Sequence, residues 1–144
     1  MRTLSKSNSD TLAVIVDLLI PKKGSLPSPS DIDIVEYIDN TISHTPKLMR
    51  LFVDGLRDIN DKDFLLLTEK EQIDFLEKYE CSNNLFFTEL IRHTYNGYYT
   101  NRMVVRAIGM TGHPPQPKGY NLEQGNNFKL LEKVRERGQI WRNP

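Results

Sequence analysis

The sequence predicts an all-α protein: a compact multi-helix domain of about five to seven helices, followed by an extended Pro/Gly-rich C-terminal arm. Apolar residues recur at a spacing of three and four positions through most of the first 108 residues, and cap-forming residues precede several of these stretches. No run alternates apolar and polar residues as a half-buried strand does. We expect three parts: a flexible N-terminus over 1–10, a helical domain over 11–108, and an arm with a short C-terminal helix over 109–144.

The first two helices are predicted from caps and breakers. Ser9 and Asp10 are suitable N-caps for the first, and Pro21 ends it. Ser30 or Asp31 begins the second, which carries acidic residues in its opening turns, where the helix dipole favours them.

Three carboxylates, Asp33, Glu36 and Asp39, lie close together in the second helix. Such a cluster could bind a metal or serve in acid–base chemistry. No histidine or second acidic motif accompanies it, so a solvated helix face is the favoured interpretation.

The next two helices have stronger start signals. Thr45 can cap a third helix with Pro46 at its first position, and Asn60 lies near its end. Thr68 and Glu71 form a capping-box pattern at the start of the fourth.

The longest predicted helix covers residues 85–98. Its apolar residues fall on two adjacent lines, which predicts a central helix packed on more than one side. We expect this helix to break at Gly97 and a short second helical piece to run through Ile108. The two lines are Phe86, Leu90 and Thr94, and Phe87, Ile91 and Tyr95.

The arm that follows cannot form a core by itself. Pro114, Pro115 and Pro117 lack backbone donors and favour an extended path. Such a segment needs a surface to lie on, either of this protein or of a partner. Near its end we expect a short helix over 127–137, stopped at Gly138, with Ile140 and Trp141 as apolar anchors.

Composition excludes several classes of function. Lys and Arg number 19, as do Asp and Glu, so no net field attracts nucleic acid or an anionic membrane. No apolar run approaches the roughly 20 residues of a membrane span. The lone Cys81 cannot form an intramolecular disulfide.

Motifs that would indicate catalysis are absent: there is no phosphate-binding glycine loop, nucleophile elbow or paired-cysteine motif. His44, His93 and His113 are far apart in the sequence. For His93 a hydrogen-bonded structural role is favoured over a catalytic one, whereas for His113 a partner contact and a turn role are equally supported. A small hydrolase or lyase that uses His93 or His113 with a nearby carboxylate is the enzyme alternative.

Three tyrosines, Tyr95, Tyr98 and Tyr99, gather where the long helix ends. Their rings could stack on sugars or on the rim of a flavin. Packing within the core, with the hydroxyl groups reaching the surface, is the favoured interpretation, because aromatic residues at helical spacing usually supply buried area.

Several stretches together resemble the gluconate 2-dehydrogenase subunit 3 family. They are TLAVIVDLLIP, the helix IDIVEYIDNTI, and FFTELIRHTYNGYYTNRMVVRAIGMTG. Members of this family are small subunits of flavin-dependent sugar and polyol dehydrogenases. The extension HPPQPKGYNLE resembles the tail of members that accompany glucoside 3-dehydrogenases.

The resemblance implies a non-catalytic accessory subunit that binds no cofactor. FAD and the catalytic base would belong to a large subunit of the glucose-methanol-choline (GMC) type, electrons would leave through a cytochrome c subunit, and the small subunit would support maturation or export. The implied contact surface combines the tyrosine group with the arm. Its expected partner-binding residues are Tyr95, Tyr98, Tyr99, His113, Pro114, Pro115, Pro117, Tyr120 and Trp141.

Localisation and partner leave alternatives open. Family members commonly carry a twin-arginine signal and work in the periplasm, but MRTLSKSNSD has neither that motif nor an apolar region, so the cytoplasm is the alternative. A free-standing helical adaptor, whose arm binds some other protein, is the second function that the sequence supports.

Overall fold

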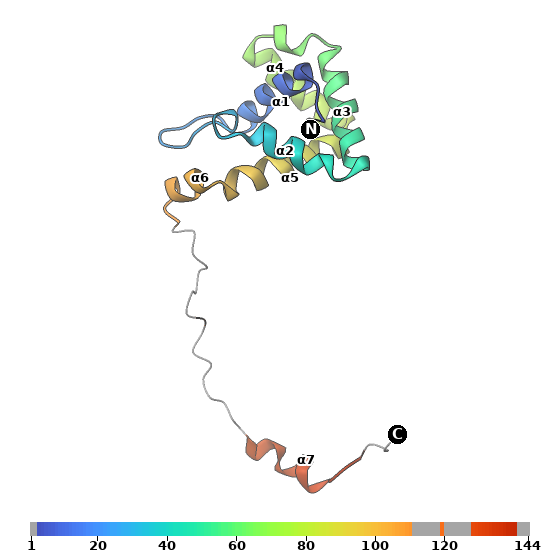
Figure 1. Ribbon diagram of the computed structural model, residues 1–144, viewed down its shortest axis with the longest axis vertical. Helices are drawn as coiled ribbons and strands as arrows, with labels where there is room; N and C mark the ends of the chain where they lie inside the picture. Colours follow the sequence, from blue (N-terminus) through green and yellow to red (C-terminus); the bar gives the residue numbers. More distant parts are fainter. Residues whose placement is uncertain (1–2, 111–118, 120–127, 141–144) are drawn as a thin grey trace. The chain divides into compact units, whose positions relative to one another are not determined.

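The computed structural model describes residues 3–110, 119 and 128–140. The chain divides into two compact units, Met1–Gly112 and His113–Pro144, which we treat separately. Apart from a single β-bridge between Lys23 and Leu26, the regular elements of the described residues are all helical, which confirms the all-α class. Figure 1 shows the helices of the first unit packed around one another.

In chain order, the first unit contains α1 Lys6–Leu19, η1 Ser30–Ile32, α2 Ile34–Ser43, α3 Pro46–Asn60, η2 Phe64–Leu66, α4 Glu69–Ser82, α5 Asn84–Thr100 and α6 Arg102–Ala107, where η marks a 3-10 helix. The second unit contains η3 Phe128–Leu131 and α7 Glu132–Glu136.

Helix α5 is the central element of the first unit, as its two apolar lines predict. It packs against α2, α3, α4 and α6. The line through Phe86, Leu90 and Thr94 is completely buried. The adjacent line passes from buried Phe87 to exposed Tyr95, so the last turns of α5 reach the surface.

Two glycines allow neighbouring helices to approach α5 closely. A Cβ atom at Gly55 of α3 would lie 2.6 Å from Cδ2 of Phe86, and one at Gly97 of α5 would lie 2.6 Å from Cδ1 of Tyr37 in α2. The predicted break at Gly97 is therefore wrong. α5 continues to Thr100 because this glycine makes room for the Tyr37 ring instead of turning the chain.

The start of α1 was predicted one turn too late. Ser5, in an extended conformation, is the N-cap, and its hydroxyl oxygen accepts a hydrogen bond of 3.2 Å from the backbone N–H of Asn8. The helix therefore begins at Lys6, and Ser9 and Asp10 lie inside it.

The starts of α3 and α4 agree with the prediction. Thr45 occupies the N-cap position of α3 and Pro46 is its first residue, although the Thr45 side chain makes no capping hydrogen bond. At the start of α4 the Glu71 carboxylate accepts hydrogen bonds from the backbone N–H of Thr68, at 2.9 Å, and from its hydroxyl, at 2.7 Å. These bonds to the ionised form lower the pKa of Glu71.

The helical part of the second unit lies within the region predicted for it. η3 and α7 together occupy 128–136, and Gly138 follows with a φ of 69°. No side chain among residues 128–140 is buried. Ile140, expected to be an apolar anchor, is 80% exposed, and the other expected anchor, Trp141, lies outside the described residues.

The close approach at Gly55 leads to a stability prediction. Gly55→Ala should lower the free energy of unfolding, because overpacking costs about 1–3 kcal/mol against the fully buried Phe86 ring. Most of this range exceeds the roughly 1 kcal/mol that alanine gains over glycine in a helix. Gly97→Ala should cost less, because Tyr37 is 38% exposed and its ring can turn outward.

Urea unfolding of both variants, followed by circular dichroism, measures the difference. A Gly55→Ala protein at least as stable as the wild type would contradict the prediction. So would a Gly97→Ala protein that loses more stability than Gly55→Ala.

Candidate interaction surface

The three tyrosines near the end of α5 have different environments. Tyr98 is 1% exposed, and its hydroxyl donates a hydrogen bond of 2.8 Å to the carbonyl oxygen of Pro27. Burial, followed by the neighbouring Tyr99, raises the pKa of Tyr98. Tyr98 therefore holds the loop before η1 against α5. Because it is buried, it offers little ring surface to a partner.

Tyr95 and Tyr99 are presented to solvent, with 43% and 52% of their surface exposed. Their rings meet edge to face, with centroids 5.9 Å apart. Exposed apolar side chains continue along the chain through α6. We call this set the aromatic edge: Tyr95, Tyr99, Met103, Ile108 and Met110.

The remaining predicted contact residues cannot be compared with the structure. His113, Pro114, Pro115, Pro117, Tyr120 and Trp141 lie outside the described residues. Of the predicted set, the structure places Tyr95, Tyr98 and Tyr99 together, and the chain leads from them through α6 toward the arm.

His93 has the environment of a packed histidine. It is 5% exposed, and its ring meets Phe52 edge to face at 5.9 Å. Its Nε2 lies 3.1 Å from a guanidinium nitrogen of Arg92 and 3.5 Å from Oε2 of Glu89. Burial, then the charge of Arg92, lowers the pKa of His93, while Glu89 acts in the opposite direction. The imidazole is therefore neutral at pH 7.

Of the three clustered carboxylates, Asp39 serves the fold, whereas Asp33 and Glu36 are exposed. Asp39 is buried, and its Oδ1 accepts hydrogen bonds from the backbone N–H groups of Thr3, at 3.0 Å, and Leu4, at 2.9 Å. The interpretation of Asp39 as part of a solvated face is therefore wrong, because it binds the beginning of the chain. Within the described residues, no three His, Cys, Asp or Glu side chains lie close enough to hold a metal ion.

A groove that the sequence interpretation missed lies between α3 and the segment from the end of α4 into α5. Its volume is about 720 Å³. We call it the α3–α5 groove. It is lined by Thr45, Lys47, Leu48, Arg50, Leu51, Asp54, Gly55, Asp58, Tyr79, Asn83, Leu85, Glu89 and Arg92. One sequence signal could have pointed to it: Leu85 is apolar but belongs to neither apolar line of the predicted helix, and in the structure it is 60% exposed. The exposed, free Cys81 lies two residues before Asn83.

Within the described part of the chain, no helix is both long and apolar enough to cross a membrane.

The model of the family described as gluconate 2-dehydrogenase subunit 3 matches residues 6–112. This range contains α1 to α6 and the α3–α5 groove, together with the aromatic edge. Searches of curated proteins and of solved structures give no match.

The environment of His93 predicts a pH dependence of stability. The pKa of His93 is lowered below 6.5 in the folded protein, so the unfolded chain takes up a proton at higher pH than the folded one. The free energy of unfolding should fall as the pH falls below about 6.5, by at most about 1.4 kcal/mol per pH unit from this group. Replacing His93 by Gln should remove this contribution.

Urea unfolding at pH 7, 6 and 5 tests this expectation, with each protein compared with its own value at pH 7. The wild type should lose more stability than His93→Gln. An identical pH dependence of the two proteins would refute it.

Proposed function

Because the chain belongs to the gluconate 2-dehydrogenase subunit 3 family, we propose that it is the small accessory subunit of a flavin-dependent sugar or glucoside dehydrogenase. In this proposal it binds a GMC-type large subunit and supports that subunit's maturation or export. The chain performs no chemistry itself. FAD and the catalytic base belong to the large subunit.

The observation that carries the proposal is the extent of the family match. It spans residues 6–112, so it includes the whole helical part of the first unit and not an isolated motif. The family is named for a small subunit of a dehydrogenase complex, which suggests that this chain has a non-catalytic role in such a complex.

The aromatic edge supports a protein-binding role. Tyrosine and methionine are enriched at protein interfaces, where large side chains bury much area for a modest loss of conformational freedom. Tyr95 and Tyr99 form a preassembled pair, because each ring already packs against the other. In the proposal, the large subunit covers this edge and the arm that follows it. Contacts along the arm offset the entropy lost when it is ordered.

The finer features of the complex are part of the same proposal. Electrons pass from the flavin to a cytochrome c subunit, and the complex works in the periplasm. The environment of His93 does not favour the hydrolase or lyase alternative, because its ring is buried and lies against the Glu89–Arg92 pair.

Co-expression tests the proposal. A GMC-type large subunit from the same organism is produced with and without this chain, and soluble FAD-loaded protein and dye-linked sugar oxidation are measured. We expect the large subunit to be soluble and active only with this chain. A large subunit that is equally active alone and forms no complex would instead favour the free-standing adaptor.

The aromatic edge gives a more specific prediction. The double substitution Tyr95→Ala with Tyr99→Ala should weaken binding of the large subunit by about 5- to 30-fold, as expected when interface aromatic residues contribute roughly 1–2 kcal/mol in total. Both residues are about half exposed and lie outside the buried core, so the fold should persist.

A matched control replaces two other exposed apolar side chains, Leu65→Ala with Leu66→Ala in η2. This pair should leave the affinity within about twofold of the wild type, since it lies outside the aromatic edge. Affinities are measured by titration calorimetry with purified subunits. Equal losses in both double variants would place the contact elsewhere.

A further inference from the structure

Hydrogen bonds within the chain already order the floor of the α3–α5 groove. The Tyr79 hydroxyl donates a hydrogen bond of 3.3 Å to the carbonyl oxygen of Gly55, and Asn83 Nδ2 donates one of 3.0 Å to the Tyr79 hydroxyl. These bonds fix the end of α4 against α3. Leu48 and Leu51 add partly buried apolar surface, and Leu85 adds an exposed side chain on the opposite wall.

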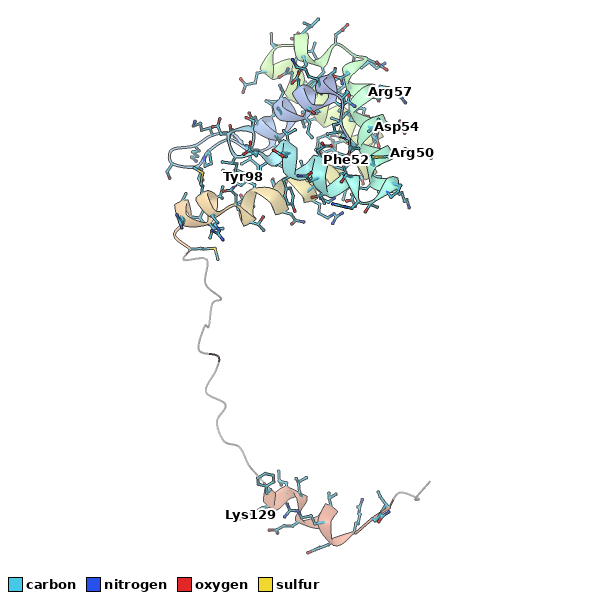
Figure 2. All side chains as sticks on the ribbon, in the orientation of Figure 1. Arg50, Phe52, Asp54, Arg57, Tyr98 and Lys129 are labelled. Carbon is cyan, nitrogen blue, oxygen red and sulfur yellow. The ribbon has the colours of Figure 1, made fainter. Side chains whose placement is uncertain are left out.

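The charges along the α3 wall are ordered by sign. Lys47 and Arg50 come first, and Asp54 and Asp58 follow. Their spacing of three or four residues places all four on one side of the helix, along roughly 16 Å at 1.5 Å per residue. Figure 2 shows Arg50 and Asp54 on the outer side of α3, whereas Phe52 points inward.

The acidic end and the basic end of the α3 wall differ in whether their side chains already form salt bridges. Asp54 accepts a hydrogen bond from Arg57 at 3.1 Å. Within the described residues, Lys47 and Arg50 take part in no salt bridge. Both cations are exposed and therefore available to acidic groups of a partner.

The shape and charge of the groove select the class of partner. Nucleic acid or an anionic membrane would require one positive field, but here the positive and negative ends are both on the rim. Two copies of this chain facing each other through the same hollow would enclose unfilled space, which costs packing energy. A convex helix with an apolar stripe fills a groove between helices.

We propose that the α3–α5 groove binds an amphipathic helix of the dehydrogenase large subunit, an inference that rests on the function proposed above. The bound helix presents an apolar stripe about three turns long, which matches the length of the charged wall. Its acidic side chains face Lys47 and Arg50, and its basic side chains face Asp54 and Asp58. This contact is separate in sequence from the aromatic edge and engages the first half of α5 instead of its last turns.

Two groove variants of the full chain test the inference. Leu51→Arg places a charge in the apolar floor, and the double substitution Lys47→Glu with Arg50→Glu reverses the cationic end. Each should weaken binding of the purified large subunit by at least about tenfold. The second variant changes only exposed side chains and should therefore fold like the wild type. Circular dichroism and urea unfolding check that both variants are folded.

The control reverses the same number of charges elsewhere: Lys23→Glu with Lys70→Glu, two exposed lysines outside the groove. Its affinity should stay within about twofold of the wild type. A carbodiimide, which joins an amine to a carboxylate in direct contact, should couple Lys47 to an acidic residue on a helix of the large subunit.

The outcomes distinguish a failure of the groove proposal from a failure of the proposed accessory function. If the large subunit binds the wild type and both groove variants equally, the groove is not its docking site, although the accessory role stands. If the wild type forms no complex, the accessory role fails and the inference fails with it. Sedimentation velocity of the free chain provides a last check: a wild-type dimer that Leu51→Arg converts to monomer would show that a second copy occupies the groove, and would overturn the inference.

Discussion

The packing of three helices around the Phe86 ring is the constraint on which the rest of the first unit depends. Phe52 of α3 meets this ring at a centroid distance of 5.5 Å and Tyr79 of α4 at 6.1 Å, both edge to face. Gly55 lies against the same ring without a side chain. The spacing between α3 and α5 is therefore set at this point, and the α3–α5 groove is the outer side of the same arrangement.

The two ends of α5 have different roles because the helix passes from the core to the surface. Its first half joins the core through Phe86 and Leu90, and its last turns expose Tyr95 and Tyr99. Tyr98, between these two, is buried and bonded to Pro27, which holds the last turns in place. The exposed tyrosines are thus held on an ordered helix, and this chain loses little conformational entropy when a partner binds them.

Local features of the sequence predicted the helices well, because periodicity and caps act within a few residues. The Thr68–Glu71 cap and the two apolar lines of α5 are of this kind. Contacts between distant residues could not be predicted in this way. Asp39 binds backbone groups 35 and 36 positions earlier, so its sequence neighbours gave no sign of its role. Gly97 was misread because the Tyr37 ring that explains it lies in another helix.

The α3–α5 groove was missed for the same reason, since its walls come from two separate stretches of the chain, 45–58 and 79–92. Function depended on a different kind of information. The geometry presents surfaces suited to binding, but it is the family match over residues 6–112 that connects them to a dehydrogenase complex.

The single cysteine has a practical consequence. Cys81 is exposed and free, it is the one thiol in the sequence, and it lies in the last turn of α4, two residues from groove-lining Tyr79 and Asn83. A maleimide fluorophore or a nitroxide spin label can therefore be attached at this single position, near the end of α4, in the native chain without mutagenesis. Its emission or its line shape would then report in real time when a large subunit changes the surroundings of this end of α4.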